Sequence, residues 1–291
     1  QQERRQNVDS NPGAILDERV WEKLFAGHPY SIPVIGRMDE VAKLSREDAT
    51  EWYRNWYGPE NAVLVVAGDI TAQELRPLVE ATYGGVPRRG DLGQRKWPEV
   101  RALSQSFELE HSDTKVRQAV WSRNWIGVPM GHEDAEALQV AMQVLGGGRT
   151  GRLYRTLVEG GQAVTAWGYS AEMEAPGLVA VSVSPSQGVT INAARTAAMK
   201  VVTEFAEDGP SDEELARAKG IIAASAVFRR DNQQQLADWY GLMLSSGVPL
   251  ERIETWDERI AAVTREDVVD VVTRYLIAPH HVDSILLPGR E

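Results

Sequence analysis

An internal repeat is the feature of this sequence that most restricts its possible folds. Residues 44–48 read Leu-Ser-Arg-Glu-Asp, and about 220 positions later residues 263–267 read Val-Thr-Arg-Glu-Asp. In each copy a Ser or Thr stands three positions before an acidic residue, which is typical of the capping box that begins a helix. A proline and an apolar run follow each copy, ending at Gly68 and Pro288. The shared order of helix, proline and buried strand predicts a duplicated structural unit.

The repeat predicts how the chain is divided. Its second copy closes a unit that begins near Phe107, and the matching start of the first unit would fall before residue 1. We therefore expect residues 1–85 to be the C-terminal part of an incomplete first domain and residues 105–291 to be a complete second domain. Residues 86–104 are polar and rich in Gly and Pro, which predicts an exposed linker. On this interpretation the chain is a truncated, C-terminal portion of a longer protein.

Hydrophobic periodicity predicts an α+β fold for the second unit, with an antiparallel sheet and helices packed on one face. Strands are expected near 105–110, 116–125, 164–171, 177–184 and 282–287. Helices are expected over 132–145, 149–159, 188–208, 211–229, 232–246, 250–261 and 265–276. In the first unit, the apolar run 62–68 is expected to form a buried strand.

Composition excludes several classes of function. The chain has no cysteine, which rules out disulfides, thiolate nucleophiles and cysteine-ligated metals. No apolar run approaches the roughly 20 residues that span a bilayer. A formal net charge of −11 argues against nucleic acid as a partner.

The sequence contains no complete catalytic motif among those considered. None of the five histidines forms His-Glu-x-x-His or His-x-x-Glu-His, the spacings that hold zinc on a helix. His28 is expected to be structural or solvated in a loop, and His280-His281 to be a solvated pair. Residues 146–151 match the dinucleotide pattern Gly-x-Gly-x-x-Gly, but helical periodicity precedes them, which favours a turn between two helices.

Four stretches carry a family resemblance. They are Phe-Ala-Gly-His-Pro-Tyr at 25–30, Pro-Val-Ile-Gly at 33–36, Trp-Tyr-Gly-Pro-Glu-Asn-Ala at 56–62 and Val-Val-Ala-Gly-Asp at 65–69. Together they resemble the pitrilysin/insulinase family of zinc metallopeptidases, the inverzincin group that includes the mitochondrial processing peptidase. Thr-Gly-Arg-Leu-Tyr at 150–154 agrees with the second half of the family. The resemblance implies two homologous α+β domains, in line with the repeat.

The resemblance implies one metal ligand in this chain. In the family, two histidines of His-x-x-Glu-His and a later glutamate hold zinc, and the Glu of the motif activates the attacking water. Gln-Glu-Arg-Arg at 2–5, followed by Asp-Ser-Asn-Pro at 9–12, matches the region of the third ligand, which makes Glu3 the candidate. A solvated glutamate is the alternative. The histidine motif is expected upstream, so no catalytic residue and no bound zinc are expected for this chain alone.

The resemblance also indicates what is missing from the second domain. The family places an Arg and a Tyr after the Gly-rich turn, where they contact substrate; here Val158 and Thr165 stand at those positions. Valine cannot make a charge-assisted hydrogen bond. This pattern implies the zinc-bearing subunit of a metalloendopeptidase, acting on peptides or unfolded proteins as a homo- or heterodimer with a paralogue that carries the Arg/Tyr pair. A non-catalytic structural or peptide-holding subunit is the alternative. The lack of cysteine weakly favours a bacterial periplasm.

Overall fold

A five-stranded sheet forms the centre of the protein. The computed structural model describes residues 1–90, 92 and 96–289. The strands lie in the order β1-β5-β2-β4-β3. Only the β1–β5 pair is parallel, and the other three pairs are antiparallel. The strands are β1 (Phe107–Asp113), β2 (Val120–Ile126), β3 (Ala163–Ala171), β4 (Leu178–Pro185) and β5 (Val282–Pro288).

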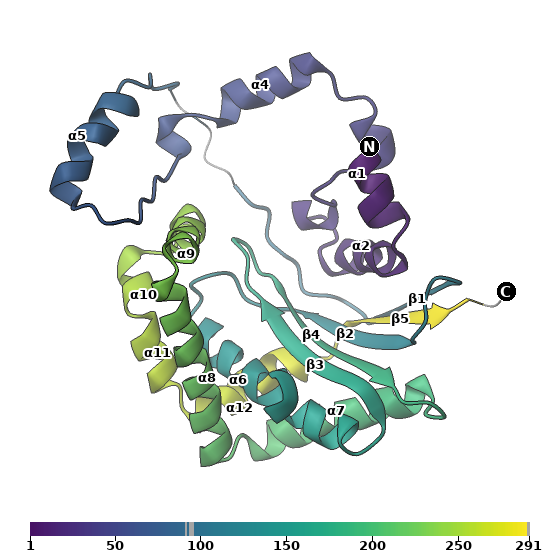
Figure 1. Ribbon diagram of the computed structural model, residues 1–291. Helices are drawn as coiled ribbons and strands as arrows, with labels where there is room; N and C mark the ends of the chain where they lie inside the picture. The colour runs from purple at the N-terminus through teal and green to yellow at the C-terminus, as the bar shows by residue number, and fades with distance from the viewer. Residues whose placement is uncertain (91, 93–95, 290–291) are drawn as a thin grey trace.

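One face of this sheet is covered by helices that contribute most of the core (Figure 1). Alternate residues of β4, namely Val179, Val181 and Val183, are fully buried on this side because successive side chains of a strand point to opposite faces. The helices are α6 (Ala135–Gly146), α7 (Ile191–Asp208), α8 (Asp212–Asp231), α9 (Gln233–Ser245), α10 (Leu250–Glu254), α11 (Trp256–Ala262) and α12 (Arg265–Leu276).

These elements confirm the predicted α+β class and most of the predicted boundaries. The capping boxes predicted in the two copies of the repeat both begin helices: Ser45 accepts from the Asp48 amide at 3.1 Å, and Thr264 accepts from the Asp267 amide at 3.1 Å. The single helix expected over 250–261 is divided into α10 and α11 at Thr255. In the part of the chain that the structure describes, no helix is both long and apolar enough to cross a membrane.

A helix from the expected first domain lies on the opposite face of the sheet. Helix α2 (Pro12–Leu24) begins at Asn11, whose side chain accepts from the amides of Gly13 and Ala14. Its buried residues Leu16, Val20 and Leu24 pack with apolar residues of the sheet, including Leu109, Leu178 and Val282. Each such leucine contributes roughly 1.5–3 kcal/mol when buried. The sheet is apolar on part of both faces, and α2 covers part of the second.

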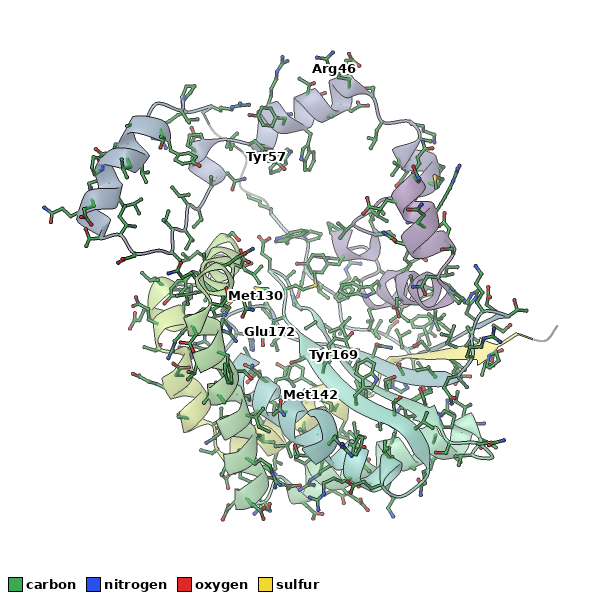
Figure 2. The ribbon with its side chains drawn as sticks, viewed as in Figure 1. Arg46, Tyr57, Met130, Met142, Tyr169 and Glu172 are labelled. Atoms are coloured by element: carbon green, nitrogen blue, oxygen red, sulfur yellow. The ribbon has the colours of Figure 1, made fainter. Side chains whose placement is uncertain are left out.

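The segment that follows α2 leaves the sheet. We call residues 38–90 the arm; it contains α3 (Met38–Val41), α4 (Arg46–Trp56), the 3₁₀ turn η3 (Pro59–Asn61) and α5 (Ala72–Thr82). The structure describes the whole arm, and none of its residues is buried. Arg46 and Tyr57, at the two ends of α4, lie away from the sheet (Figure 2).

The buried strand expected over 62–68 is wrong for this chain. Val63, Leu64 and Val66 are 46–50% exposed, and this described segment is extended but joins no sheet. Its counterpart in the repeat, β5, lies between β1 and β2 and is hydrogen-bonded on both sides. A strand is stable only with such neighbours. The apolar run has the composition of a strand but no partner strand.

The division of the chain at residues 85 and 105 stays a prediction. Helix α2 packs on β1, β2 and β5, so part of the expected first domain contacts the sheet of the second. Residues 91 and 93–95 of the expected linker lie outside the described residues. Another part of the linker is anchored, since the ring of Trp97 stacks on His28 with centroids 5.2 Å apart.

Candidate functional site

The first region predicted from the sequence lies around Glu3. The side chain of Glu3 is exposed on α1 (Gln2–Arg4), which continues into the π-helical turn η1 (Arg5–Asp9). Its neighbour Arg4 is buried and donates two hydrogen bonds to the Glu18 carboxylate, both 2.8 Å long. A third hydrogen bond joins Arg4 to the carbonyl of Gly36 at 2.6 Å. Arg4 therefore fixes this segment against α2 while Glu3 faces solvent.

The residues around Glu3 do not complete a zinc site. Within residues 1–90, 92 and 96–289, no group of three or more His, Asp or Glu side chains is arranged to hold a metal ion. Zinc sites in enzymes use three protein ligands and leave a fourth position for water or substrate. A single exposed carboxylate does not fit that requirement.

The second predicted region lies where the family Arg and Tyr would stand. Val158 ends the π-helical turn η5 (Tyr154–Val158) and packs, half-buried, against the main core. Thr165 is exposed on β3, opposite Ser184 of β4. Both predicted regions thus adjoin a π-helical turn, a feature that is frequent at functional sites. Sequence periodicity carries no signal for such turns.

The Gly-rich turn has a packing role. Helix α6 ends at Gly146, and the helical segments η4 (Gly148–Thr150) and η5 follow, so the turn joins helices as expected. A Cβ added at Gly146 would lie 2.1 Å from the backbone nitrogen of Gly168 on β3. The absence of a side chain lets α6 approach the sheet. The glycine pattern is thereby explained without a nucleotide.

The histidines have structural surroundings. His28 is buried, and its Nδ1 accepts from the Tyr30 amide at 3.1 Å, which caps the 3₁₀ turn η2 (Pro29–Ser31). Burial lowers the pKa of His28. The expectation of a solvated His280-His281 pair is wrong, because both residues are half-buried. The His281 Nε2 lies 3.8 Å from the Asp283 carboxylate.

A buried charge network at one end of β3 was not predicted. Glu136 on α6 is almost fully buried and accepts from Arg252 at 2.8 Å and from Arg259 at 2.8 and 2.9 Å. Glu172, which follows β3 and is labelled in Figure 2, lies near this group. Burial, with a smaller contribution from the Glu136 carboxylate, raises the pKa of Glu172 to about 7. No sequence pattern predicts this charge network, because its residues come from separate elements.

The sheet face opposite the main helices is open beside β3. We call the exposed side chains Thr165, Trp167 and Tyr169 the open face; they alternate along β3 and point to one side. Trp167 is 43% exposed and Tyr169 40% exposed, and their ring centroids are 5.3 Å apart. Large aromatic side chains exposed together often mark binding surfaces. In the described part of the chain, β3 pairs with β4 on one side and has no strand on the other.

The chain matches a known protein family over most of its length. The family pattern described as "Peptidase M16 inactive domain" matches residues 43–222, which is more than half of the chain. The chain belongs to the M16 peptidase family. This assignment confirms the resemblance to the pitrilysin/insulinase group, and it agrees with the expectation that the chain is a C-terminal portion of a family member.

Individual M16 relatives extend beyond this chain. An uncharacterized zinc protease from Mycobacterium tuberculosis is 25% identical over 290 residues, covering 96% of this chain and 64% of the relative. The crystal structure of a protease from Helicobacter pylori has a TM-score of 0.88 at 18% identity, over 98% of this chain and 69% of that one. The periplasmic protease PqqL from Escherichia coli has a TM-score of 0.76 at 17% identity, over 99% of this chain and 32% of that one. The two solved structures share the fold.

Proposed function

We propose that this chain is the peptide-holding portion of a zinc-dependent metalloendopeptidase, of the zinc-bearing subunit type that lacks the substrate-contacting Arg/Tyr pair. The observation that carries the proposal is the free edge of β3 beside the open face. Membership of the M16 family and relatives named zinc proteases support the reaction class. The chain spans 64% of the length of the M. tuberculosis relative, so the activity belongs to the longer protein.

The edge of β3 is suited to an extended peptide. An extended segment can add to an exposed sheet edge through main-chain hydrogen bonds, and pockets for alternate side chains then give selectivity. β3 runs over nine residues, from Ala163 to Ala171, which is long enough to pair with a peptide of similar length. Trp167 and Tyr169 would contact side chains on one face of that peptide.

The metal and the partner are further parts of the proposal. Glu3 would be the third zinc ligand of the complete protein, with the two histidines supplied from outside this chain. No step of the reaction is assigned to the described residues, because they do not assemble a zinc site. A paralogous subunit would supply the Arg/Tyr pair that Val158 and Thr165 replace. A periplasmic location is supported by the name of the structurally similar PqqL.

The peptide-holding role is tested by selective N-methylation. A short unstructured peptide, labelled with a fluorophore, is titrated with the chain and its anisotropy is followed. N-methyl groups are then placed on either the odd or the even residues of the peptide. Because alternate amides of an added strand point toward the edge, one methylation series should abolish binding and the other should leave it nearly unchanged. Equal effects of both series, or no binding of the parent peptide, would contradict the proposal.

The metal assignment is tested by elemental analysis. The chain alone, dialysed against zinc and then against buffer, should retain far less than one zinc per chain and should cleave no peptide. Glu3→Gln should leave its residual zinc content unchanged. Stoichiometric zinc that depends on Glu3 would show that this chain holds a complete site.

A further inference from the structure

One acidic residue of α2 is unpaired while the other charged residues of that helix have partners. Within the described residues, the side chain of Asp17 has no hydrogen bond or ion pair. The remaining charged residues of α2 pair as Glu18 with Arg4, Arg19 with the Glu110 carbonyl, Glu22 with Arg37, and Lys23 with the Phe107 ring. An unpaired carboxylate on an otherwise paired helix is available to a cation from outside the chain.

Helix geometry directs Asp17 toward β3. With about 100° per residue, Arg19 and Lys23 lie on one flank of the buried stripe formed by Leu16 and Val20, and Asp17 lies on the other. The first flank contacts β1, through Arg19 and Lys23. The flank of Asp17 therefore faces the other side of the sheet, where β4 and β3 lie.

Electrostatics agree with this placement. The negative charge of Asp17 is one cause of the raised pKa of the Tyr169 phenol, after burial of the phenol. Asp17 is itself exposed to solvent, yet surrounding atoms desolvate its carboxylate and raise its pKa. These two effects are consistent with the helix geometry, which places the Asp17 carboxylate on the side of α2 nearer to Tyr169.

We propose that Asp17, Trp167 and Tyr169 form a subsite for a lysine or arginine side chain of a peptide held along β3. The subsite rests on the proposed peptide-holding function and adds the class of side chain that it selects. The faces of Trp167 and Tyr169 attract a cation through their ring quadrupoles. Asp17 supplies the counter-charge at the end of the aliphatic stem, which packs on the rings.

The charge of the whole chain acts in the same direction. The formal net charge is −11, so a basic peptide is attracted and an acidic peptide is repelled before contact. This general attraction would favour any cationic residue. The subsite makes the narrower claim that one position of the peptide gains most from a positive charge, and that this gain depends on Asp17.

The test compares two peptides and four forms of the protein. One peptide carries a single lysine and the other carries norleucine at the same position, which keeps the stem and removes the charge. Each is titrated with the native chain, with Asp17→Asn, with Trp167→Leu and with Glu22→Gln. Glu22→Gln is the matched control. It also removes one negative charge from α2, but at a residue that is paired with Arg37.

The native chain and Glu22→Gln should prefer lysine over norleucine about tenfold, from the sum of a cation–π contact and a partly screened ion pair. Asp17→Asn should reduce the preference to about threefold or less, with a melting temperature equal to or above that of the native chain. Trp167→Leu should also reduce the preference. A lysine preference that Asp17→Asn and Glu22→Gln reduce equally would assign it to net charge and overturn the subsite.

The two proposals fail in different ways. If neither peptide binds the native chain, the peptide-holding function fails, and the subsite fails with it. If both peptides bind equally and N-methylation still shows strand addition, the function holds and only the subsite is overturned.

Discussion

The internal repeat allows a truncation to alanine at two matched positions that lie in different environments. Leu276 ends α12 and Tyr57 follows α4, and the two occupy equivalent places after their capping boxes. Leu276 is 1% exposed in the main core, whereas Tyr57 is 59% exposed on the arm. We predict that Leu276→Ala is strongly destabilising and that Tyr57→Ala is nearly neutral.

The expected magnitudes follow from burial. Truncating a fully buried leucine to alanine removes its transfer free energy and leaves a cavity, at a cost of about 2–5 kcal/mol. Substitutions on an exposed surface change the free energy of unfolding by about 0.5 kcal/mol or less. Leu276 is fully enclosed among the main core residues. We therefore expect Leu276→Ala to lower the free energy of unfolding by about 3 kcal/mol.

Urea denaturation followed by far-ultraviolet circular dichroism measures the difference. With an m value of roughly 3 kcal/mol/M, Leu276→Ala should lower the midpoint by about 1 M and Tyr57→Ala should leave it in place. The protein must be monomeric at the concentration used, which sedimentation establishes. A loss for Tyr57→Ala that matches the loss for Leu276→Ala would refute the reasoning, because the arm would then be part of the core.

Three further predictions concern the arm and the buried charges. Amide hydrogen exchange should protect β2 and β4 far more than residues 62–68, which join no sheet among the described residues; equal protection in a monomer would contradict this. Glu136→Ala should cost about 3 kcal/mol in thermal unfolding because two half-buried guanidinium groups lose their carboxylate partner, while the exposed ion-pair residue Asp270, changed to Ala, should cost about 0.5 kcal/mol or less. Hydrogen bonds from Arg274 lower the pKa of Asp134, so this carboxylate stabilises the fold above its unfolded pKa of about 3.9 and the stability is lost as the pH falls. Arg274→Gln should therefore lower the melting temperature more at about pH 6 than at about pH 3, and an equal loss at both would exclude this linkage.

Local sequence patterns, each formed by a few neighbouring residues, were sufficient to predict much of the fold. The capping boxes at Ser45 and Thr264 begin helices as predicted, because a side-chain oxygen three residues from an amide can satisfy it in any tertiary setting. β4 was predicted from a run of apolar residues, and that run is buried on both faces of the sheet. The family was also identified from short motifs, since these match position by position.

Features that depend on distant segments were decided by tertiary structure. The run 62–68 has the composition of a strand, but a strand needs neighbours, and in the described chain it has none. The spacing of Leu16, Val20 and Leu24 gives α2 one apolar face, but the local sequence does not indicate that this face packs on the second side of the sheet. His281 became half-buried through its contacts with Asp283 and Trp125.

The open face shows the same limit. Trp167 and Tyr169 alternate along a predicted strand, and the sequence alone determines that they share a face. Which face they share, and that α2 presents Asp17 on the flank facing them, depend on how elements roughly 150 residues apart pack together. The sequence determined much of the secondary structure and the family of this protein because those follow from local hydrogen bonding and short motifs. Only the packing of distant segments decided which charged and aromatic groups meet at its surface.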